Sequence, residues 1–263
     1  MRQKRAWMAI ATAACGAFFG WLAASGQWTP LAEGQDKPSA NGPLERTILP
    51  IPAPRVAPFT QLDARDAKAP ARFEVKPPKG APNVVIVLLD DIGFGHSSAF
   101  GGPCQMPTLE RLAAGGLKYN RFHTTALCSP TRMALLTGRN HHSASCGVVQ
   151  EIATAFPGYT GARPASVAPL AEMLRLNGYS TAAFGKYHET PPWEISPSGP
   201  FDRWPTHSGF DKFYGFIGGE TNQWAPLIYD GVTHLETPQE PGYHFTTDMT
   251  NQAIAWMRYQ QAL

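Results

Sequence analysis

The feature that most constrains the fold is an uninterrupted apolar run at residues 84–89, Val-Val-Ile-Val-Leu-Leu. A half-buried strand alternates apolar and polar residues, whereas a strand that is covered on both faces does not need to. The run therefore predicts a central strand of a mostly parallel sheet with helices on both faces, which is an α/β fold.

Two carboxylates, Asp90 and Asp91, follow this predicted strand directly. Open α/β sheets place ligands at the carboxyl ends of their strands. Adjacent carboxylates repel each other unless a cation or a proton intervenes, and a hard divalent cation with oxygen ligands suits such a pair. The alternative is a solvated Asp-Asp turn, and these residues by themselves leave both interpretations open.

Helical and strand patterns alternate along the rest of the chain, as an α/β fold requires. With 263 residues, 43% hydrophobic and 16% charged, the chain is long enough for one such core. We expect helices at residues 106–116, 166–178 and 246–257 and strands at residues 117–123 and 179–184.

The N-terminus combines a basic start, an apolar run and small residues, which predicts a secretory signal peptide at residues 1–26. An uncleaved membrane anchor is the alternative. Removal of residues 1–26 takes away three positive charges and no acidic residue, so the formal net charge falls from +2 to −1. No basic stripe remains for nucleic acid, and we expect an exported protein, periplasmic or secreted.

Residues 27–82 contain 11 of the 25 prolines, which excludes a long helix there. We interpret this stretch as an extended arm or linker. The globular part is expected at residues 83–263.

Residues 128–132 read Cys-Ser-Pro-Thr-Arg and predict the start of a helix. Ser129 suits the cap, Pro130 the first turn and Gly138 the end. Cys128 and Arg132 then share one face, where the helix N-terminus and the guanidinium stabilise an anion. A structural cysteine beside a surface arginine is the alternative.

The strand predicted at residues 179–184 leads into Gly-Lys-Tyr-His. Lys186 and His188 are two residues apart, so both side chains project to one side of an extended chain. Alone, each is more commonly a surface group or a satisfied core residue.

Together these motifs resemble the sulfatase family. Residues 128–132 match its Cys-x-Pro-x-Arg core, and residues 178–188 match its Gly-Tyr-x-Thr-x-x-x-Gly-Lys-aromatic-His signature. The order of Asp pair, Pro-Thr-Leu helix and Cys motif is also that of the family. The chain departs from the family at Glu189-Thr190, where Leu-Gly is frequent.

The resemblance implies an alkaline-phosphatase-like fold and a Cα-formylglycine made from Cys128 by a formylglycine-generating enzyme. Residue 128, as the aldehyde hydrate, is then the nucleophile. The resemblance also implies Ca²⁺ on Asp90, Asp91 and residue 128. Arg132 orients the nucleophile, Lys186 binds the sulfate, and His188 helps to release it.

Cys104, Cys128 and Cys146 remain after removal of the signal peptide, an odd number. A disulfide between Cys104 and Cys146 leaves Cys128 free for modification. Two buried thiols are the alternative.

The last predicted helix reaches Leu263 with no stop signal, which indicates a chain truncated at its C-terminus. The resemblance places a further His, an Asp-Asn pair that completes the calcium site, and a further Lys beyond residue 263. We therefore expect the 263-residue chain alone to be inactive.

The predicted activity is hydrolysis of sulfate esters, small molecules or glycans, of the arylsulfatase type. A phosphonate or phosphate-ester hydrolase of the same fold is one alternative. A truncated chain without catalytic activity is the other.

Overall fold

The computed structural model describes residues 44–262, in two compact units. Of the first unit, residue 44 and Ala53–Ala71 are described, an exposed extended stretch with one turn in which Arg65 pairs with Asp63. The second unit comprises Glu45–Pro52 and Arg72–Leu263 and contains all the candidate site residues. The predicted signal peptide at residues 1–26 lies outside the described residues. None of the described helices has the length and apolar composition needed to cross a bilayer.

The core of the second unit is a four-stranded sheet with strand order β1-β2-β3-β4. Its strands are β1 (Ala182–Lys186), β2 (Lys212–Phe216), β3 (Ile228–Asp230) and β4 (Thr233–Leu235). β1 and β2 are parallel, with Phe184 opposite Tyr214, and the other two pairs are antiparallel. The described sheet is therefore mixed.

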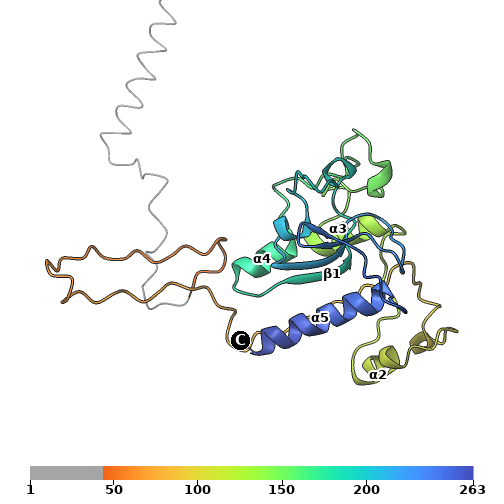
Figure 1. Ribbon diagram of the computed structural model, residues 1–263, viewed down its shortest axis with the longest axis horizontal. Coiled ribbons are helices and arrows are strands. Elements are labelled where there is room, and N and C mark those ends of the chain that lie inside the picture. Colours follow the sequence, from red (N-terminus) through yellow and green to blue (C-terminus); the bar gives the residue numbers. More distant parts are fainter. Residues whose placement is uncertain (1–43, 263) are drawn as a thin grey trace, which may run out of the picture. The chain divides into compact units, whose positions relative to one another are not determined.

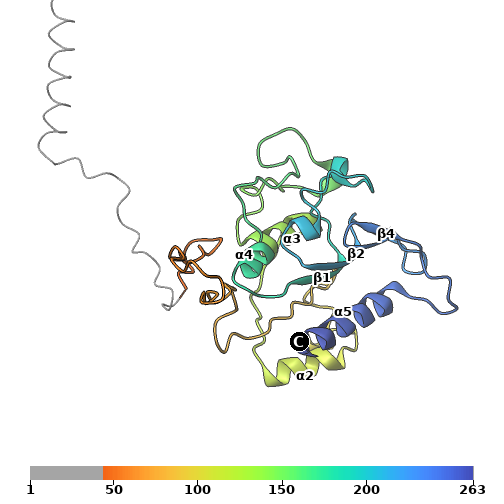
Figure 2. The same ribbon diagram turned by 60° about the vertical axis from the view of Figure 1, so that its left-hand side comes forward.

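Helices cover both faces of this sheet (Figures 1 and 2). α3 (Cys128–Thr137) and α4 (Leu170–Leu176) lie on one side of β1, and α5 (Phe245–Ala262) lies on the other. Phe213 of β2 packs with Tyr187, Trp204 and Leu136 of α3, whereas Tyr214 packs with Phe245 at the start of α5. Successive residues of a strand point to opposite faces, so β2 contributes to both cores. The predicted α/β architecture with helices on both faces is confirmed.

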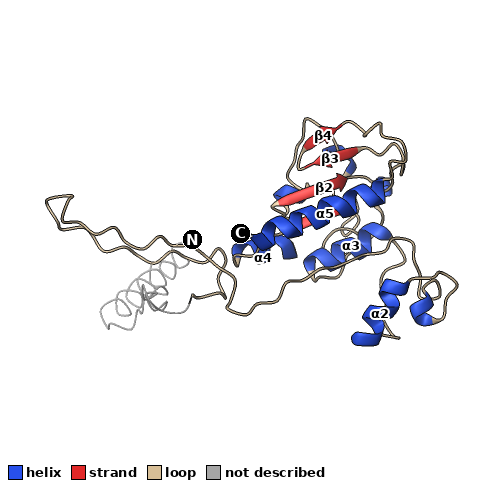
Figure 3. Ribbon diagram, turned by 60° about the horizontal axis from the view of Figure 1, so that its bottom comes forward, coloured by secondary structure: helices blue, strands red, loops and turns tan. Residues whose placement is uncertain are grey.

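Two predicted strands do not form. Residues 84–89 are in a loop segment outside the sheet (Figure 3). The exposed fractions of their side chains range from 41% to 74%. Residues 117–123 likewise contain neither helix nor strand. A strand needs a hydrogen-bonded neighbour and a covered face, and neither segment has a ladder partner among the described residues.

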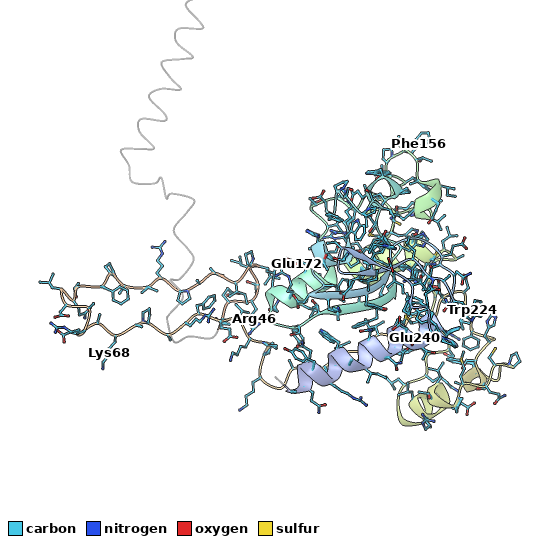
Figure 4. The ribbon with its side chains drawn as sticks, viewed as in Figure 1. Arg46, Lys68, Phe156, Glu172, Trp224 and Glu240 are labelled. Atoms are coloured by element: carbon cyan, nitrogen blue, oxygen red, sulfur yellow. The ribbon has the colours of Figure 1, made fainter. Side chains whose placement is uncertain are left out.

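The remaining elements lie close to their predicted places. α2 (Pro107–Gly115) begins at its proline, packs beside the short 3₁₀ helix η1 (Ser98–Phe100) and has no buried residue. Three further 3₁₀ helices, η2 (Gln150–Ile152), η3 (Pro192–Glu194) and η4 (Pro205–His207), lie in the connecting loops. Figure 4 marks Phe156 and Trp224 in such loops, where both rings are largely exposed.

Candidate active site

The candidate nucleophile, Cys128, is the first residue of α3, half-buried and with a free thiol. Leu127 precedes the helix in an extended conformation and makes no side-chain cap, so the predicted cap at Ser129 is wrong. Ser129 instead lies inside the first turn, where its Oγ accepts a hydrogen bond of 3.3 Å from the backbone N–H of Gln150. The predicted stop is confirmed: Gly138 adopts the left-handed region, with φ 64°, and its N–H donates to the carbonyl of Ala134.

Arg132, one turn further along α3, contacts both Asp90 and the last residue of β1. Its Nη1 donates to the carbonyl of Lys186 at 2.7 Å, and its Nη2 lies 3.6 Å from Oδ2 of Asp90. The Nζ of Lys186 donates to the same oxygen at 2.6 Å. Three residues separated by up to 96 positions in the sequence therefore form one charged cluster.

Two cations control the charge of Asp90. Partial burial acts to raise the pKa of this carboxyl, but the hydrogen bond from Lys186 and the charges of Arg132 and Lys186 outweigh it. The pKa of Asp90 is therefore lowered, and the carboxylate is ionised at neutral pH.

His188 lies just beyond β1 and faces a different carboxylate. Its backbone has φ 57°, a left-handed conformation that is uncommon for a residue with a side chain, so the chain is not extended there. The expectation that Lys186 and His188 project together from an extended chain is therefore wrong. The Nε2 of His188 lies 2.9 Å from both carboxylate oxygens of Glu151 in η2.

The charge state of His188 is set by opposing effects. Burial lowers the pKa of this imidazole, contact with Glu151 raises it, and the charges of Lys186 and Arg132 lower it again. The net pKa is below the ordinary value, so His188 is neutral near pH 7. Burial acts to raise the pKa of Glu151, but the hydrogen bond to His188, backbone hydrogen bonds and the charge of His188 together lower it.

Glu189, at the position where the chain departs from the family pattern, is a buried carboxyl. It is 3% exposed, and neither of its side-chain oxygens has a hydrogen-bond partner among the described residues. Burial raises its pKa well above the ordinary value, although the charges of Arg132 and Arg163 oppose this and a charge on Cys128 reinforces it. Glu189 is therefore electrostatically coupled to the α3 turn.

Of the two alternatives left open for Cys104 and Cys146, the disulfide does not form, and both thiols are free. Cys104 is exposed, whereas Cys146 is buried with Met133, Ala144 and Val167. Burial raises the pKa of the Cys146 thiol, which keeps it protonated and unreactive. Cys128 is thus the half-buried cysteine that stands beside the charged cluster.

Comparison with known proteins decides the family. The family model described as Sulfatase matches residues 82–262, more than half of the chain. The chain belongs to the sulfatase family. It is 36% identical to an uncharacterised sulfatase of Schizosaccharomyces pombe over 151 residues, which cover 55% of this chain and 26% of that protein. It is 37% identical to human arylsulfatase A over 136 residues, 51% of this chain and 25% of that protein.

One solved structure also aligns with part of this chain. The crystal structure of Ps i-CgsB aligns with a TM-score of 0.48 and 18% identity, over 65% of this chain and 40% of that one. The chain spans about a quarter of the length of the curated sulfatases it matches.

The sulfatase family implies a bound calcium ion, and the described residues provide some of the oxygen ligands that it needs. Asp90 and Asp91 offer carboxylate oxygens, the donor type that Ca²⁺ prefers, and Asp91 is exposed. Ca²⁺ takes about six to eight oxygens. No group of three or more His, Cys, Asp or Glu side chains within residues 44–262 is arranged to hold a metal ion. The Asp pair therefore fits as one part of a calcium site.

Sequence reasoning missed Glu151 and the burial of Glu189. Glu151 is 37 positions from His188 and lies in a short 3₁₀ helix, so no spacing rule relates the two. The Leu-Gly to Glu189-Thr190 departure from the sulfatase signature was visible in the sequence, and an acidic residue beside a motif histidine is a usable signal.

Proposed function

We propose that this protein hydrolyses sulfate esters, with residue 128 as a Cα-formylglycine. The observation that carries the proposal is the cluster of Asp90, Arg132 and Lys186 at the α3 turn that begins with Cys128. Two cations beside a helix N-terminus favour an anionic tetrahedral group such as that of a sulfate ester. The sulfatase family match and the similarity to arylsulfatase A support the same reaction class.

Each side chain has a role in this proposal. The hydrated aldehyde supplies one hydroxyl that attacks sulfur, displacing the alcohol, and a second hydroxyl whose deprotonation expels sulfate and restores the aldehyde. His188, neutral near pH 7, accepts the proton of that second hydroxyl. Lys186 binds the sulfate oxygens, and Arg132 orients residue 128 and offsets its developing charge.

Calcium is part of the proposal. Asp90 and Asp91 supply two of its oxygen ligands, with residue 128 as a third. When bound, Ca²⁺ polarises the sulfate oxygens and the hydroxyl of residue 128.

The test of the modification is mass spectrometry of the peptide that contains residue 128. After co-expression with a formylglycine-generating enzyme, we expect that peptide to be lighter than the unmodified form by roughly 18 Da, the difference between thiol and aldehyde side chains. The peptide that contains Cys146 is the internal control and should keep its thiol. An unmodified thiol at residue 128 under these conditions contradicts the proposal.

The test of the reaction compares 4-nitrophenyl sulfate with 4-nitrophenyl phosphate. The assay uses this chain and, in parallel, the longest natural polypeptide that contains it. We expect this chain alone to be inactive. In the longer polypeptide we expect the sulfate ester to be the better substrate and Cys128→Ala to abolish its hydrolysis. Faster cleavage of the phosphate ester assigns the phosphoryl alternative, and hydrolysis that survives Cys128→Ala contradicts the formylglycine mechanism.

Export is also proposed, from the signal-peptide pattern at residues 1–26. N-terminal sequencing of protein recovered from the periplasm or medium tests it. A mature chain that begins near residue 27 supports cleavage, and an intact N-terminus in the membrane fraction supports an anchor.

A further inference from the structure

His188 and Glu151 form a close pair in which only one imidazole nitrogen is bonded. The Nε2 of His188 lies 2.9 Å from both oxygens of Glu151. The Nδ1 atom is buried and has no hydrogen-bond partner among the described residues. The residue is 2% exposed, so this nitrogen is shielded from bulk solvent.

The backbone that carries Glu151 is held by its neighbour in η2. The backbone N–H of Gln150 donates to Oγ of Ser129 in the first turn of α3, and its side-chain Nε2 donates to the carbonyl of Gly161 at 3.0 Å. Gln150 is 1% exposed, so these bonds are protected from water. The short helix that carries Glu151 is therefore hydrogen-bonded to the helical turn that begins with Cys128.

Gly219, in the chain segment that follows β2, packs against both Glu151 and His188. A Cβ atom at this position lies 2.8 Å from Oε1 of Glu151 and 3.0 Å from two atoms of the His188 ring. The first distance is shorter than real Cβ contacts and the second is tighter than most, so a side chain at residue 219 would force the Glu151 carboxylate to shift. The adjacent Gly218 has open space at the equivalent point, with nothing within 4 Å.

We propose that Glu151 is the positioning residue of His188: its carboxylate accepts a hydrogen bond from Nε2–H, so that the neutral imidazole presents Nδ1 as its proton acceptor. An ionised carboxylate has no proton to donate, so the nitrogen that faces it must carry one. The partner of one ring nitrogen thereby sets the tautomer of the ring. The assignment of the tautomer stands on this geometry, and its use in sulfate release rests on the proposed function.

Every charged group around His188 bears on its protonation. Glu151 approaches from η2, Lys186 from the end of β1 and Arg132 from α3, and Asp90 feels the charge of the imidazole. Burial and the two cations oppose protonation, and Glu151 favours it. Loss of the Glu151 charge therefore leaves His188 harder to protonate and frees its ring to take the other tautomer.

The experiment measures the imidazole nitrogens of His188 by ¹⁵N NMR across a pH titration of the 263-residue chain, assigned by their loss in His188→Asn. We expect the Nε2–H tautomer in the unchanged protein. In Glu151→Gln we expect the pKa of His188 to fall by roughly one unit, the lower end of the range for an adjacent opposite charge, because Glu151 is partly exposed. Glu110→Gln, which removes the same charge in α2, should leave the titration unchanged.

A second variant separates positioning from charge. Gly219→Ala keeps every charge but displaces the Glu151 carboxylate, so it should reproduce the pKa decrease, whereas Gly218→Ala should not. An Nδ1–H tautomer in the unchanged protein, or an unchanged His188 titration in both Glu151→Gln and Gly219→Ala, overturns the proposal. Neither readout needs the modified residue 128 or any hydrolysis, so a failure here is distinct from a failure of the proposed function.

Where hydrolysis is measurable, the same variants have a kinetic signature. Glu151→Gln should lower kcat by about tenfold or more, because general-base catalysis contributes about 10²–10⁴ and the base remains present. It should also move the acidic limb of the pH profile to lower pH. A reduced rate with an unmoved limb indicates a structural effect only and contradicts the positioning role.

Discussion

The two parts of the candidate site are built on very different structure. Arg132 and His188 belong to elements packed against the sheet, where Met133 is 1% and His188 2% exposed. Asp90 and Asp91 belong to a segment, residues 83–127, whose helix α2 buries no residue and whose apolar run is open to solvent. The packed part obtains its stability from buried apolar area, whereas Asp90 reaches it through ion pairs to Arg132 and Lys186. Site geometry on the packed part is therefore set by the core, and on the other part by charge.

The largest difference between these parts is expected from truncation of apolar side chains. Met133→Ala in α3 removes a side chain packed with Ala144, Cys146 and Val167, and should lower the free energy of unfolding by about 3 kcal/mol. Leu112→Ala in α2 removes a side chain that is 65% exposed and should change it by less than about 0.5 kcal/mol. Urea denaturation followed by circular dichroism measures both. Equal losses for the two variants contradict the contrast.

The same contrast explains what the sequence could predict. Local patterns of apolar residues and stop signals predict a helix or strand without reference to distant segments. The elements predicted in this way formed, namely the helices at Cys128, Leu170 and Phe245 and the strand near Ala182. A strand also depends on its neighbours. The strand predicted at residues 84–89 from its apolar pattern did not form, because the segment has no ladder partner among the described residues.

The site divides in the same way. Motif spacing brought Cys128, Arg132, Lys186 and His188 into consideration, because each lies in a contiguous pattern. The contacts Asp90–Lys186 and Glu151–His188 span 96 and 37 positions, and they depend on how separate segments pack. Ser129 shows the limit even within a motif, since its hydroxyl bonds Gln150 and not the helix end.

The second prediction concerns the ion pairs that join Asp90 to Arg132 and Lys186. Asp90→Asn leaves Lys186 and Arg132, whose side chains are 12% and 10% exposed, without their carboxylate partner. We expect a loss of about 1–2 kcal/mol in the free energy of unfolding, at the low end for a buried pair because Asp90 is about one-third exposed. Asp91→Asn, an equal change of charge at an exposed neighbour, should cost less than about 0.5 kcal/mol.

The pH dependence of this loss has a definite sign. Because the pKa of Asp90 is lowered in the folded protein, its contribution to stability is complete above the unfolded value near about 4 and disappears as the pH falls through the folded value. The difference between the unchanged protein and Asp90→Asn should therefore be constant from pH 7 to 5 and shrink below about pH 4. A difference that grows on acidification contradicts this origin.

The smallest change in the free energy of unfolding is expected from Glu189, a buried carboxyl in the packed part that has no hydrogen-bond partner among the described residues. Glu189 is buried with both oxygens unbonded, so its ionised form costs stability, and Glu189→Gln removes the charge while keeping the shape. We expect Glu189→Gln to increase the free energy of unfolding by about 1 kcal/mol at pH 8, since the amide remains unbonded. Because burial raises the pKa of Glu189, the unchanged protein loses stability as the pH rises from the unfolded value near about 4 towards the folded one. The gain from Glu189→Gln should therefore be small at pH 4.5 and larger at pH 8.

Glu194 provides the matched control for this last prediction. It is equally buried, at 3% exposed, but Arg203 donates to its Oε1. Glu194→Gln leaves that guanidinium without an ionic partner, so it should lower the free energy of unfolding, opposite in sign to Glu189→Gln. Parallel urea titrations at the two pH values compare the variants directly. Equal destabilisation by both substitutions contradicts the prediction. It would mean that the charges of Arg132 and Arg163 fully offset the burial of the Glu189 carboxylate.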